Sequence, residues 1–249
     1  MSKYTNLLCE EIRESIESYI IEHELKPSDH LPSERELAEL FGANRLTVRA
    51  ALKMLRNEHI IVTEHGKGNF IAQPKIVEDT TYFLSFSEGW KADGYTPTNK
   101  VIFFQIIEAP ISVARHLELS LGEKVYKLMR IRYLNGSPIA FETSYIPHKY
   151  CPGLESYDFA TESLYDTLMH AYHLKLLGHR ENISITHLTK QEGLYLNAKE
   201  NDPAYRIKGV TYNSEKVIEY CITLNCADRY ILTSNLYAVS PEAGLITHR

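Results

Sequence analysis

One segment, residues 44–57, constrains this chain strongly because it carries two helical stripes of opposite character. Asn44 can cap the helix. The apolar stripe has the spacing of a core-facing helix and consists of Val48, Ala51, Leu52 and Leu55. The cationic stripe lies about a quarter turn away and consists of Arg45, Arg49, Lys53 and Arg56. No acidic residue lies between Asn44 and Asn57, so the segment predicts a helix with one buried face and one cationic face.

Two further helices are predicted before this one. The first covers residues 6–23, where apolar residues recur at helical spacing. A break follows, and the next helix begins after Ser33. Ser33 and Glu36 have the spacing of a capping box, in which each side chain satisfies the backbone of the other. Gly42 ends this helix one tight turn before Asn44.

A β-hairpin is predicted after the cationic helix. The β-prone runs at residues 60–63 and 69–72 flank a glycine-rich cationic tip, His65-Gly66-Lys67-Gly68. A helix-turn-helix with such a wing places its last helix in the major groove of DNA and its wing beside phosphates or in the minor groove.

Several cations of this motif have the chemistry of DNA contacts. Arg45, at the start of the cationic helix, suits a guanine, whereas Thr47, Arg49 and Lys53 suit phosphates or bases. Arg35, near the start of the preceding helix, is expected to reach the same strand. The cations alone would fit a solvated surface equally well. Their combination with the capping box, turn and wing favours DNA binding.

Composition is that of an ordinary globular chain and leaves function open. The 249 residues suffice for two domains, with 44% hydrophobic and 24% charged residues. The net charge of -5 argues against a protein that coats nucleic acid indiscriminately, but a local cationic face is compatible with it. Acidic residues interrupt the N-terminal segment where a signal peptide needs an apolar run, and no stretch is long enough to cross a bilayer. We therefore expect a cytoplasmic protein without membrane contact.

The chain is predicted to divide into a winged helix-turn-helix domain over residues 1–73, a linker over 74–80 and a second domain over 81–249. Asn135-Gly136 and Asn213-Ser214 are turn signals, so the β-prone runs around them should pair antiparallel. The second domain is therefore α+β. Its β-prone runs are 101–107, 124–134, 139–146, 205–212, 217–226 and 230–239, and its short helices are expected at 112–118, 163–172 and 190–197.

The run LPSERELAELFGANRLTVRAALKMLRNEHIIVTEHGKGNFI resembles the DNA-binding domain of the GntR family of bacterial regulators. The resemblance covers the first 72 residues or so. Two positions depart from the family pattern: Asn44 replaces a serine or threonine, and His59 replaces a glycine. The residues that the resemblance implies as DNA contacts are Arg35, Asn44, Arg45, Thr47, Arg49, His65, Gly66 and Lys67.

The second domain resembles the HutC-type effector domain, also called UTRA, which has a chorismate-lyase-like fold with an antiparallel sheet. The segments LSFSEGWKADG, LMRIRYLNGSPIAFETSYIP, TESLYDTL and the final EYC and ADRYIL carry this resemblance. It implies that a phosphate or comparable anion is held by Ser87, Arg130, Arg132 and Ser163. It also implies that Glu142, Tyr165 and Glu219 bind the polar remainder of the ligand, typically a sugar.

The residues themselves support an anion site independently. Arg130 and Arg132 alternate along a predicted strand, so both guanidinium groups point to one face. Ser87 and Ser163 lie at the starts of predicted short helices, whose free N–H groups and positive dipole end suit a phosphate. The alternative for the two arginines is a surface salt bridge.

Glu142 poses a problem of register. A two-residue turn at Asn135-Gly136 would place Glu142 on the face opposite the arginines. Glu142 shares their face only if the loop holds an odd number of residues or a bulge intervenes. Pro138, which cannot donate to a strand ladder, favours the bulge.

Together these patterns predict a homodimeric regulator that binds a roughly palindromic operator and responds to a sugar phosphate or similar anion. The resemblance to the GntR family implies that this regulator is a repressor. No catalytic residue, cofactor or metal site is predicted, since His170 and His173 lack a third metal ligand. Two other functions remain open: an enzyme that retains lyase-like turnover in the second domain, and a non-specific nucleic-acid binder.

Overall fold

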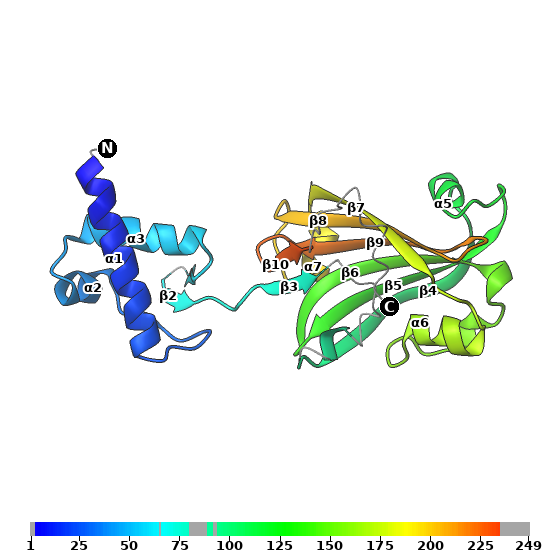
Figure 1. Cartoon of the computed structure of the whole chain (residues 1–249), viewed down its shortest axis with the longest axis horizontal. Helices are drawn as coiled ribbons and strands as arrows, with labels where there is room; N and C mark the ends of the chain where they lie inside the picture. Colours follow the sequence, from blue (N-terminus) through cyan, green and yellow to red (C-terminus); the bar gives the residue numbers. More distant parts are fainter. Residues whose placement is uncertain (1–2, 65, 80–88, 92–93, 235–249) are drawn as a thin grey trace, which may run out of the picture. The chain divides into compact units, whose positions relative to one another are not determined.

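The computed structural model describes residues 3–64, 66–79, 89–91 and 94–234. The chain forms two compact units, Met1–Lys75 and Ile76–Arg249 (Figure 1). Each unit builds its hydrophobic core from its own elements.

The first unit has three helices and a hairpin: α1 (Lys3–Glu22), α2 (Glu34–Leu40), α3 (Arg45–Asn57), β1 (Ile61–Glu64) and β2 (Gly68–Ile71). Ser33 caps α2 in the predicted capping box with Glu36. The Asn44 side chain caps α3 by accepting from the Thr47 N–H at 2.9 Å. The apolar stripe of α3 packs against α1, α2 and β1 and is buried as predicted.

The segment before α2 holds the hairpin in place. It runs antiparallel to β2, because the Leu31 N–H donates to the Asn69 carbonyl at 2.8 Å and the Ile71 N–H donates to the Asp29 carbonyl at 2.9 Å. His30 bridges Phe70 within this ladder, and their rings meet edge to face. The hairpin is therefore the outer part of a small sheet that α1, α2 and α3 support.

The second unit is built on a six-stranded sheet in the order β4-β5-β6-β9-β8-β7, in which all neighbours are antiparallel. Its consecutive pairs β5-β6 and β8-β9 are the hairpins that the turn signals predicted. Strand β7 was not predicted, and it forms one edge of the sheet. The strands are β4 (Pro97–Glu108), β5 (Lys124–Leu134), β6 (Ser137–Pro147), β7 (Gly178–His187), β8 (Pro203–Tyr212) and β9 (Val217–Cys226).

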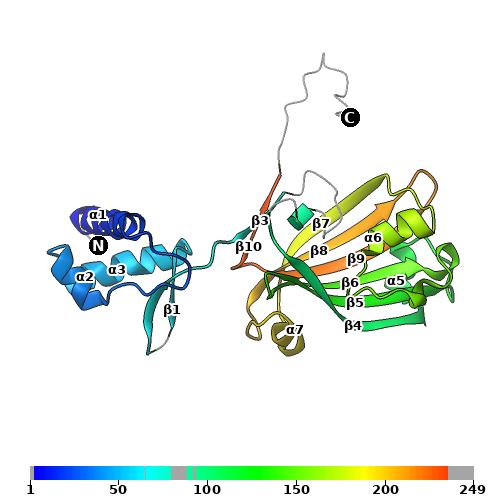
Figure 2. The same ribbon diagram turned by 90° about the horizontal axis from the view of Figure 1, so that it is seen from below.

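Helical segments lie on both faces of this sheet (Figure 2). Alternate residues of β5 separate the two faces: Leu128 joins the core around α6, whereas Val125 joins the core around α5. We call the face that carries Leu128, Arg130 and Arg132 the arginine face. The helices are α5 (Ile111–His116), α6 (Leu164–Asp166), which continues as a turn of π-helix over Thr167–Ala171, and α7 (Lys190–Tyr195). Short 3-10 turns occur at His148–Tyr150 and Leu154–Ser156.

The predicted linker over residues 74–80 is wrong for its central part. Residues Ile76–Asp79 form strand β3, which pairs in parallel with β10 (Tyr230–Thr233). Figures 1 and 2 show β3 and β10 side by side. The mixed charge of this segment and a nearby proline suggested a linker. In the structure its residues alternate between partly buried and exposed, which is the pattern of a strand with one covered face.

Candidate functional site

The exposed face of α3 presents the cationic stripe predicted from the sequence. The side chains of Arg45 and Arg49 are 62% and 56% exposed, and Lys53 is exposed as well. Arg35 on α2 and Lys67 on the hairpin are also exposed, at 75% and 71%. Helix α3 therefore has the surface that a recognition helix needs, one apolar side in the core and one cationic side in solvent.

One carboxylate, that of Glu34, forms ion pairs with two of these cations. Glu34, the first residue of α2, accepts from the Nε and Nη2 of Arg49, the latter at 2.7 Å, and lies 3.9 Å from Arg45. The hydrogen bond from Arg49 is the main cause that lowers the pKa of Glu34, and the same bond raises the pKa of Arg49. The sequence analysis did not single out Glu34, because the pairing joins two helices and depends on the turn between them.

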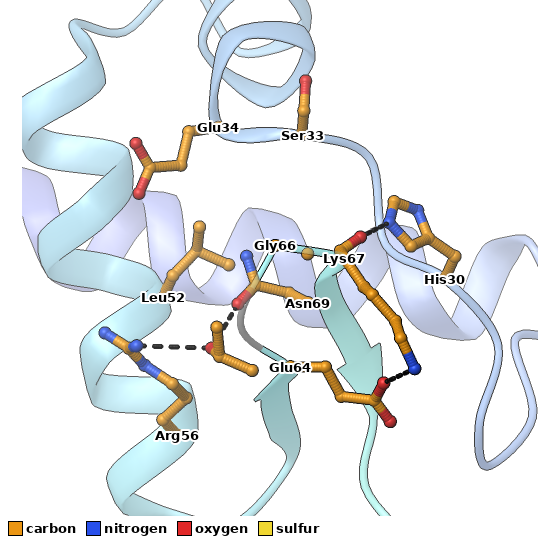
Figure 3. Close-up of a pocket in the computed structure, with 11 residues that line it drawn as sticks. His30, Ser33, Glu34, Leu52, Arg56, Glu64, Gly66, Lys67 and Asn69 are labelled. Atoms are coloured by element: carbon orange, nitrogen blue, oxygen red, sulfur yellow. Dashed lines mark hydrogen bonds and ion pairs between the residues drawn. The ribbon is translucent and has the colours of Figure 1, made fainter.

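A groove of about 370 Å³ lies between α2, α3 and the hairpin (Figure 3). On its floor Arg56 donates to the Thr63 hydroxyl at 3.2 Å, and Thr63 donates to Asn69 at 2.6 Å. These bonds tie α3 to both strands of the hairpin. At the tip, the His30 Nε2 lies 3.0 Å from the Lys67 carbonyl oxygen, and Lys67 pairs with Glu64 at 2.8 Å.

The remaining predicted DNA contacts differ in their surroundings. Asn44 is exposed, but its side-chain oxygen is engaged in the cap of α3. Thr47 is only 6% exposed, so its side chain offers little surface to a ligand. Gly66 is exposed in the tip, and His65 lies outside the described residues. Leu46, which the sequence analysis passed over, is 74% exposed beside Arg45 and has the chemistry to meet a thymine methyl group.

The second candidate site is on the arginine face of the second unit. A bulge shifts the register of β5 and β6 between Arg132 and Tyr133, so that Arg130 lies opposite Glu142. Leu134 pairs with Ser137 across the two-residue turn, and Ile139 is the extra residue. Glu142 therefore shares a face with both arginines, and the bulge next to Pro138 is the reason.

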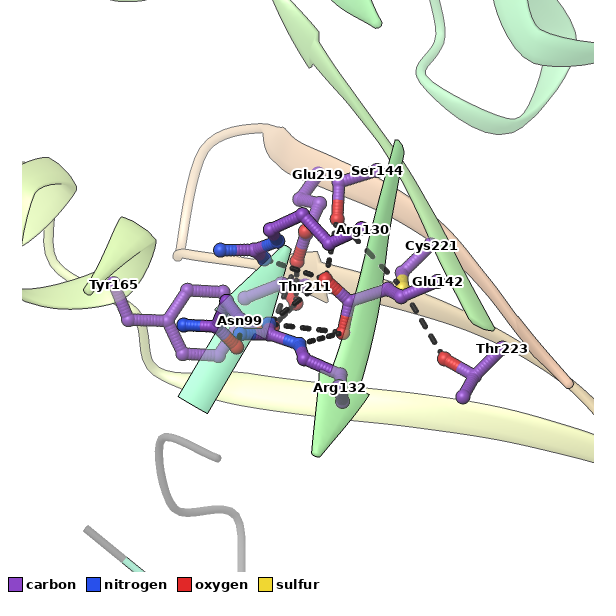
Figure 4. Close-up of polar contacts among 10 residues, drawn as sticks. All are labelled: Asn99, Arg130, Arg132, Glu142, Ser144, Tyr165, Thr211, Glu219, Cys221 and Thr223. Carbon is purple, nitrogen blue, oxygen red and sulfur yellow. Dashed lines mark hydrogen bonds and ion pairs between the residues drawn. The ribbon is translucent and has the colours of Figure 1, made fainter. Parts of the chain in front are cut away.

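Glu142 joins the two arginines (Figure 4). It accepts from the Arg130 Nη2, and it accepts from the Arg132 Nη2 at 2.8 Å. Asn99 on β4 accepts from the Arg132 Nη1 at 2.8 Å. Burial opposes the ionisation of Glu142, but the charges of Arg132 and Arg130 outweigh it and lower its pKa to about 2. Two positive charges thus face one negative charge in this cluster.

Arg130 is the least satisfied member of the cluster. It is 1% exposed, and its Nε and Nη1 atoms have no hydrogen-bond partner among the described residues. An arginine remains charged inside a protein, and a buried polar group without a partner costs about 1–3 kcal/mol, or more when it is charged. The Arg130 guanidinium therefore has unused donors where a bound anion would supply acceptors.

A second polar group lies next to the arginines on the same face (Figure 4). Glu219 of β9 is 2% exposed and accepts from the Tyr165 hydroxyl at 2.7 Å and from the Thr211 hydroxyl at 3.2 Å. His179 of β7 extends the group, since its Nδ1 lies 2.9 Å from the Thr211 hydroxyl. Burial, followed by the charge of Glu219, raises the pKa of Tyr165 well above its usual value.

Of the two serines predicted to bind an anion, the structure describes only Ser163. Ser163 caps α6 by accepting from the Asp166 N–H at 3.3 Å, and it lies two residues before Tyr165. Ser87 lies outside the described residues.

Among the described residues, no group of three or more histidine, cysteine or acidic side chains is placed to hold a metal ion. None of the helices in the described ranges is long and apolar enough to span a membrane.

Comparison with known proteins finds a family match for each of the two units. Residues 8–71 match the description "Bacterial regulatory proteins, gntR family", and residues 92–231 match the UTRA domain. The HTH-type transcriptional repressor NagR of Bacillus subtilis is 31% identical over 88% of this chain and 90% of its own length. The HTH-type transcriptional regulator GmuR of the same organism is 27% identical over 94% and 98%.

A solved structure shows the same two-part architecture. The crystal structure of PhnF from Mycobacterium smegmatis has 25% sequence identity and a TM-score of 0.65, covering 92% of this chain and 100% of that one. The family matches and the names of the relatives agree with a helix-turn-helix unit followed by a UTRA domain. The chain therefore belongs to the GntR family of bacterial regulators and carries a C-terminal UTRA domain.

Proposed function

We propose that this protein is a transcriptional repressor whose operator binding is controlled by a small phosphorylated sugar or similar polar anion. The family match, the repressor names of its relatives and the cationic face of α3 support the DNA-binding half. One observation supports the anion: the Arg130 side chain is 1% exposed and has two nitrogens without a partner among the described residues.

A phosphate fits the surroundings of Arg130 better than a neutral ligand does. The cluster of Arg130, Arg132 and Glu142 carries two positive charges and one negative charge, so its net charge is positive and attracts an anion. Planar guanidinium groups bind phosphate oxygens in pairs. The polar group around Glu219 and Tyr165 offers acceptors and hydroxyls to a polyol. A sugar phosphate presents both kinds of group on one small molecule.

In this proposal the repressor acts as a homodimer in the cytoplasm on a roughly palindromic operator. Each DNA-binding unit occupies a half-site, and the half-sites are about 34 Å apart or a multiple of that spacing. The effector releases the operator only if it prefers an arrangement of the dimer that fits the half-sites poorly. An enzyme activity in the second unit is not favoured, because the family and the relatives are regulators.

The test is a thermal-shift screen of sugar phosphates and inorganic phosphate on the full chain. A ligand present at 100 times its dissociation constant stabilises the folded protein by about 2.7 kcal/mol, which corresponds to a melting shift of about 5 °C or more for a unit of this size. The double variant Arg130→Ala with Arg132→Ala should lose this shift and keep its DNA binding.

The matched control is Arg180→Ala with Arg206→Ala, which removes two arginines of β7 and β8 outside the cluster. It should retain the full shift. The anion site is refuted if the cluster variant responds like the control, or if no phosphorylated compound shifts the melting of the unmodified protein.

A further inference from the structure

The six-stranded sheet of the second unit has two edge strands, β4 and β7, and they differ in how well they are protected. An exposed edge strand attracts a further strand, and edges are usually protected by proline, lysine or a bulge. Strand β4 has all three: Pro97, Lys100 and a bulge between Val101 and Phe103. Strand β7 has neither proline nor lysine, and its register with β8 runs from end to end without a bulge. Of the two, β7 is therefore the edge that is open to another strand.

Every second residue of β7 turns its main-chain groups away from β8. The Leu188 N–H donates to the Asp202 carbonyl at 3.0 Å, in the same register as the β7–β8 ladder. Main-chain groups in an antiparallel ladder point alternately to the two sides of a strand, so Asn182, Ser184 and Thr186 bond to β8. The groups at the open edge are those of the residues in between, Glu181, Ile183, Ile185 and His187.

Two isoleucines extend an apolar surface to this edge. Ile183 is 46% exposed and lies opposite Ile207 of β8, which is 8% exposed. Ile185 is 74% exposed and lies opposite the half-buried Tyr205. The two isoleucines are on the same face of β7, because side chains alternate along a strand. A strand placed beside β7 would therefore remove apolar surface from water, which favours its binding.

The sequence of β7 is complementary to itself when two copies run antiparallel about Ser184. In this register Ile183 of one copy lies opposite Ile185 of the other, and Glu181 lies opposite His187. Apolar pairs and pairs of acidic with basic side chains stabilise neighbouring strands when they lie directly opposite. All four are residues whose main-chain groups point outward, so the same register also forms the ladder. A centre at Ile183 would instead place the Glu181 carboxylate opposite Ile185.

We infer that β7 is the dimer interface of this protein: two copies pair antiparallel through β7, with Ser184 at the two-fold axis. Their six-stranded sheets then join into one sheet of twice that size. The inference rests on the proposed function, which requires a homodimer, and it adds the strand, the register and the residues that form the dimer. The strand that occupies the open edge is thus β7 of a second copy of this chain.

A disulfide across the axis tests the register in the full chain. Ser184 faces its own copy, and its main-chain groups point to β8, so the two Cα atoms form a non-hydrogen-bonded pair about 4.5 Å apart. That distance is within the range of a disulfide. Ser184→Cys should therefore form a covalent dimer under oxidised glutathione, seen on a non-reducing gel. The unmodified chain gives the background, since three of its four cysteines are buried.

The matched controls are Asn182→Cys and Thr186→Cys, two residues to either side of Ser184 on the same face of β7. Each lies four residues out of register with its own copy, about 13 Å along the strand, which no disulfide spans. Neither variant should crosslink alone. A mixture of the two should crosslink after subunit exchange, because residue 182 of one copy lies opposite residue 186 of the other.

A second variant tests whether β7 holds the dimer together. Ile183→Lys with Ile185→Lys removes the apolar contacts and places lysine opposite lysine, so it should weaken the dimer about 100-fold or more. The control is Ile106→Lys with Ile111→Lys, which adds the same charge at isoleucines that are 37% and 69% exposed outside β7. It should keep the dimer affinity within about threefold. Analytical ultracentrifugation measures both, and circular dichroism establishes that each variant is folded.

Two results would overturn the inference, and they separate it from the proposed function. If the unmodified protein sediments as a monomer at every concentration tested, the homodimer of the proposed function fails and this interface fails with it. If it sediments as a dimer, but Ser184→Cys does not crosslink above background or the β7 lysine variant stays as dimeric as its control, the homodimer stands and the β7 interface is wrong. Crosslinking of Asn182→Cys alone would likewise refute the centre at Ser184.

Discussion

At the scale of single residues, the role of each charged side chain depends on the groups with which it forms ion pairs and hydrogen bonds. The cationic stripe of α3 was visible in the sequence, but the pairing of Arg49 with Glu34 was not, because it depends on how the turn orients two helices. Arg130 and Arg132 were likewise visible, whereas the unpartnered nitrogens of Arg130 emerge only from the packing around it. The sequence therefore indicated which charged residues are candidates for the two sites. It did not indicate which hydrogen-bond partners their side chains find or lack.

The Glu34–Arg49 pair leads to a prediction about specificity. Glu34 holds Arg49 in one orientation and adds a negative charge to the DNA-facing surface. Glu34→Gln should strengthen binding to random-sequence duplex and steepen its salt dependence by about one unit of slope. It should also reduce discrimination for the operator roughly fivefold, because Arg49 is no longer preoriented. Anisotropy titrations across a range of salt concentrations measure both effects.

The control for this prediction is Glu58→Gln. Glu58 follows α3 and pairs with Arg13 of α1, so this variant removes the same charge from the other end of the helix. It should leave the salt slope and the discrimination nearly unchanged. Equal behaviour of the two variants would mean that net charge, and not the orientation of Arg49, sets the specificity.

At the scale of elements, the sequence predicted those with strong local signals. The caps at Ser33 and Asn44 and the two-residue turn at Asn135-Gly136 all have local causes and were found. Strand β7 was missed because it is an edge strand whose residues are mostly exposed, so it lacks a clear apolar alternation. Strand β3 was missed because its partner β10 lies about 150 residues away in the chain, and such pairing leaves no local signal.

The wing shows how one glycine can fix an element. Gly68 has a φ of +117°, and a Cβ there would lie 2.6 Å from the His30 Nε2. Gly68→Ala should therefore displace the His30 ring, break its hydrogen bond with the Lys67 carbonyl and cost about 2–3 kcal/mol of the first unit's stability. Thermal unfolding measures the loss, and hydrogen exchange should show faster opening of the β2 amides.

Gly66→Ala separates backbone strain from this clash. Gly66 also has a positive φ, +76°, but a Cβ there would have no neighbour within 4 Å. It should cost only about 1 kcal/mol, the usual penalty for a left-handed residue other than glycine. Equal losses in the two variants would show that His30 does not restrain the wing.

At the scale of the whole molecule, hydrophobic cores that each lie within one unit imply two folding units. The core of the first unit is formed by residues 12–71, and the cores of the second lie wholly after residue 75. Calorimetry of the full chain should therefore resolve two transitions.

Leu52→Ala, at a position 2% exposed in the first core, should cost about 2–5 kcal/mol and lower only the first unit's transition, by roughly 10 °C or more. An effective sugar phosphate should raise only the other transition, because it binds the second unit alone. A single transition that moves as a whole with both perturbations would show that the two units unfold together.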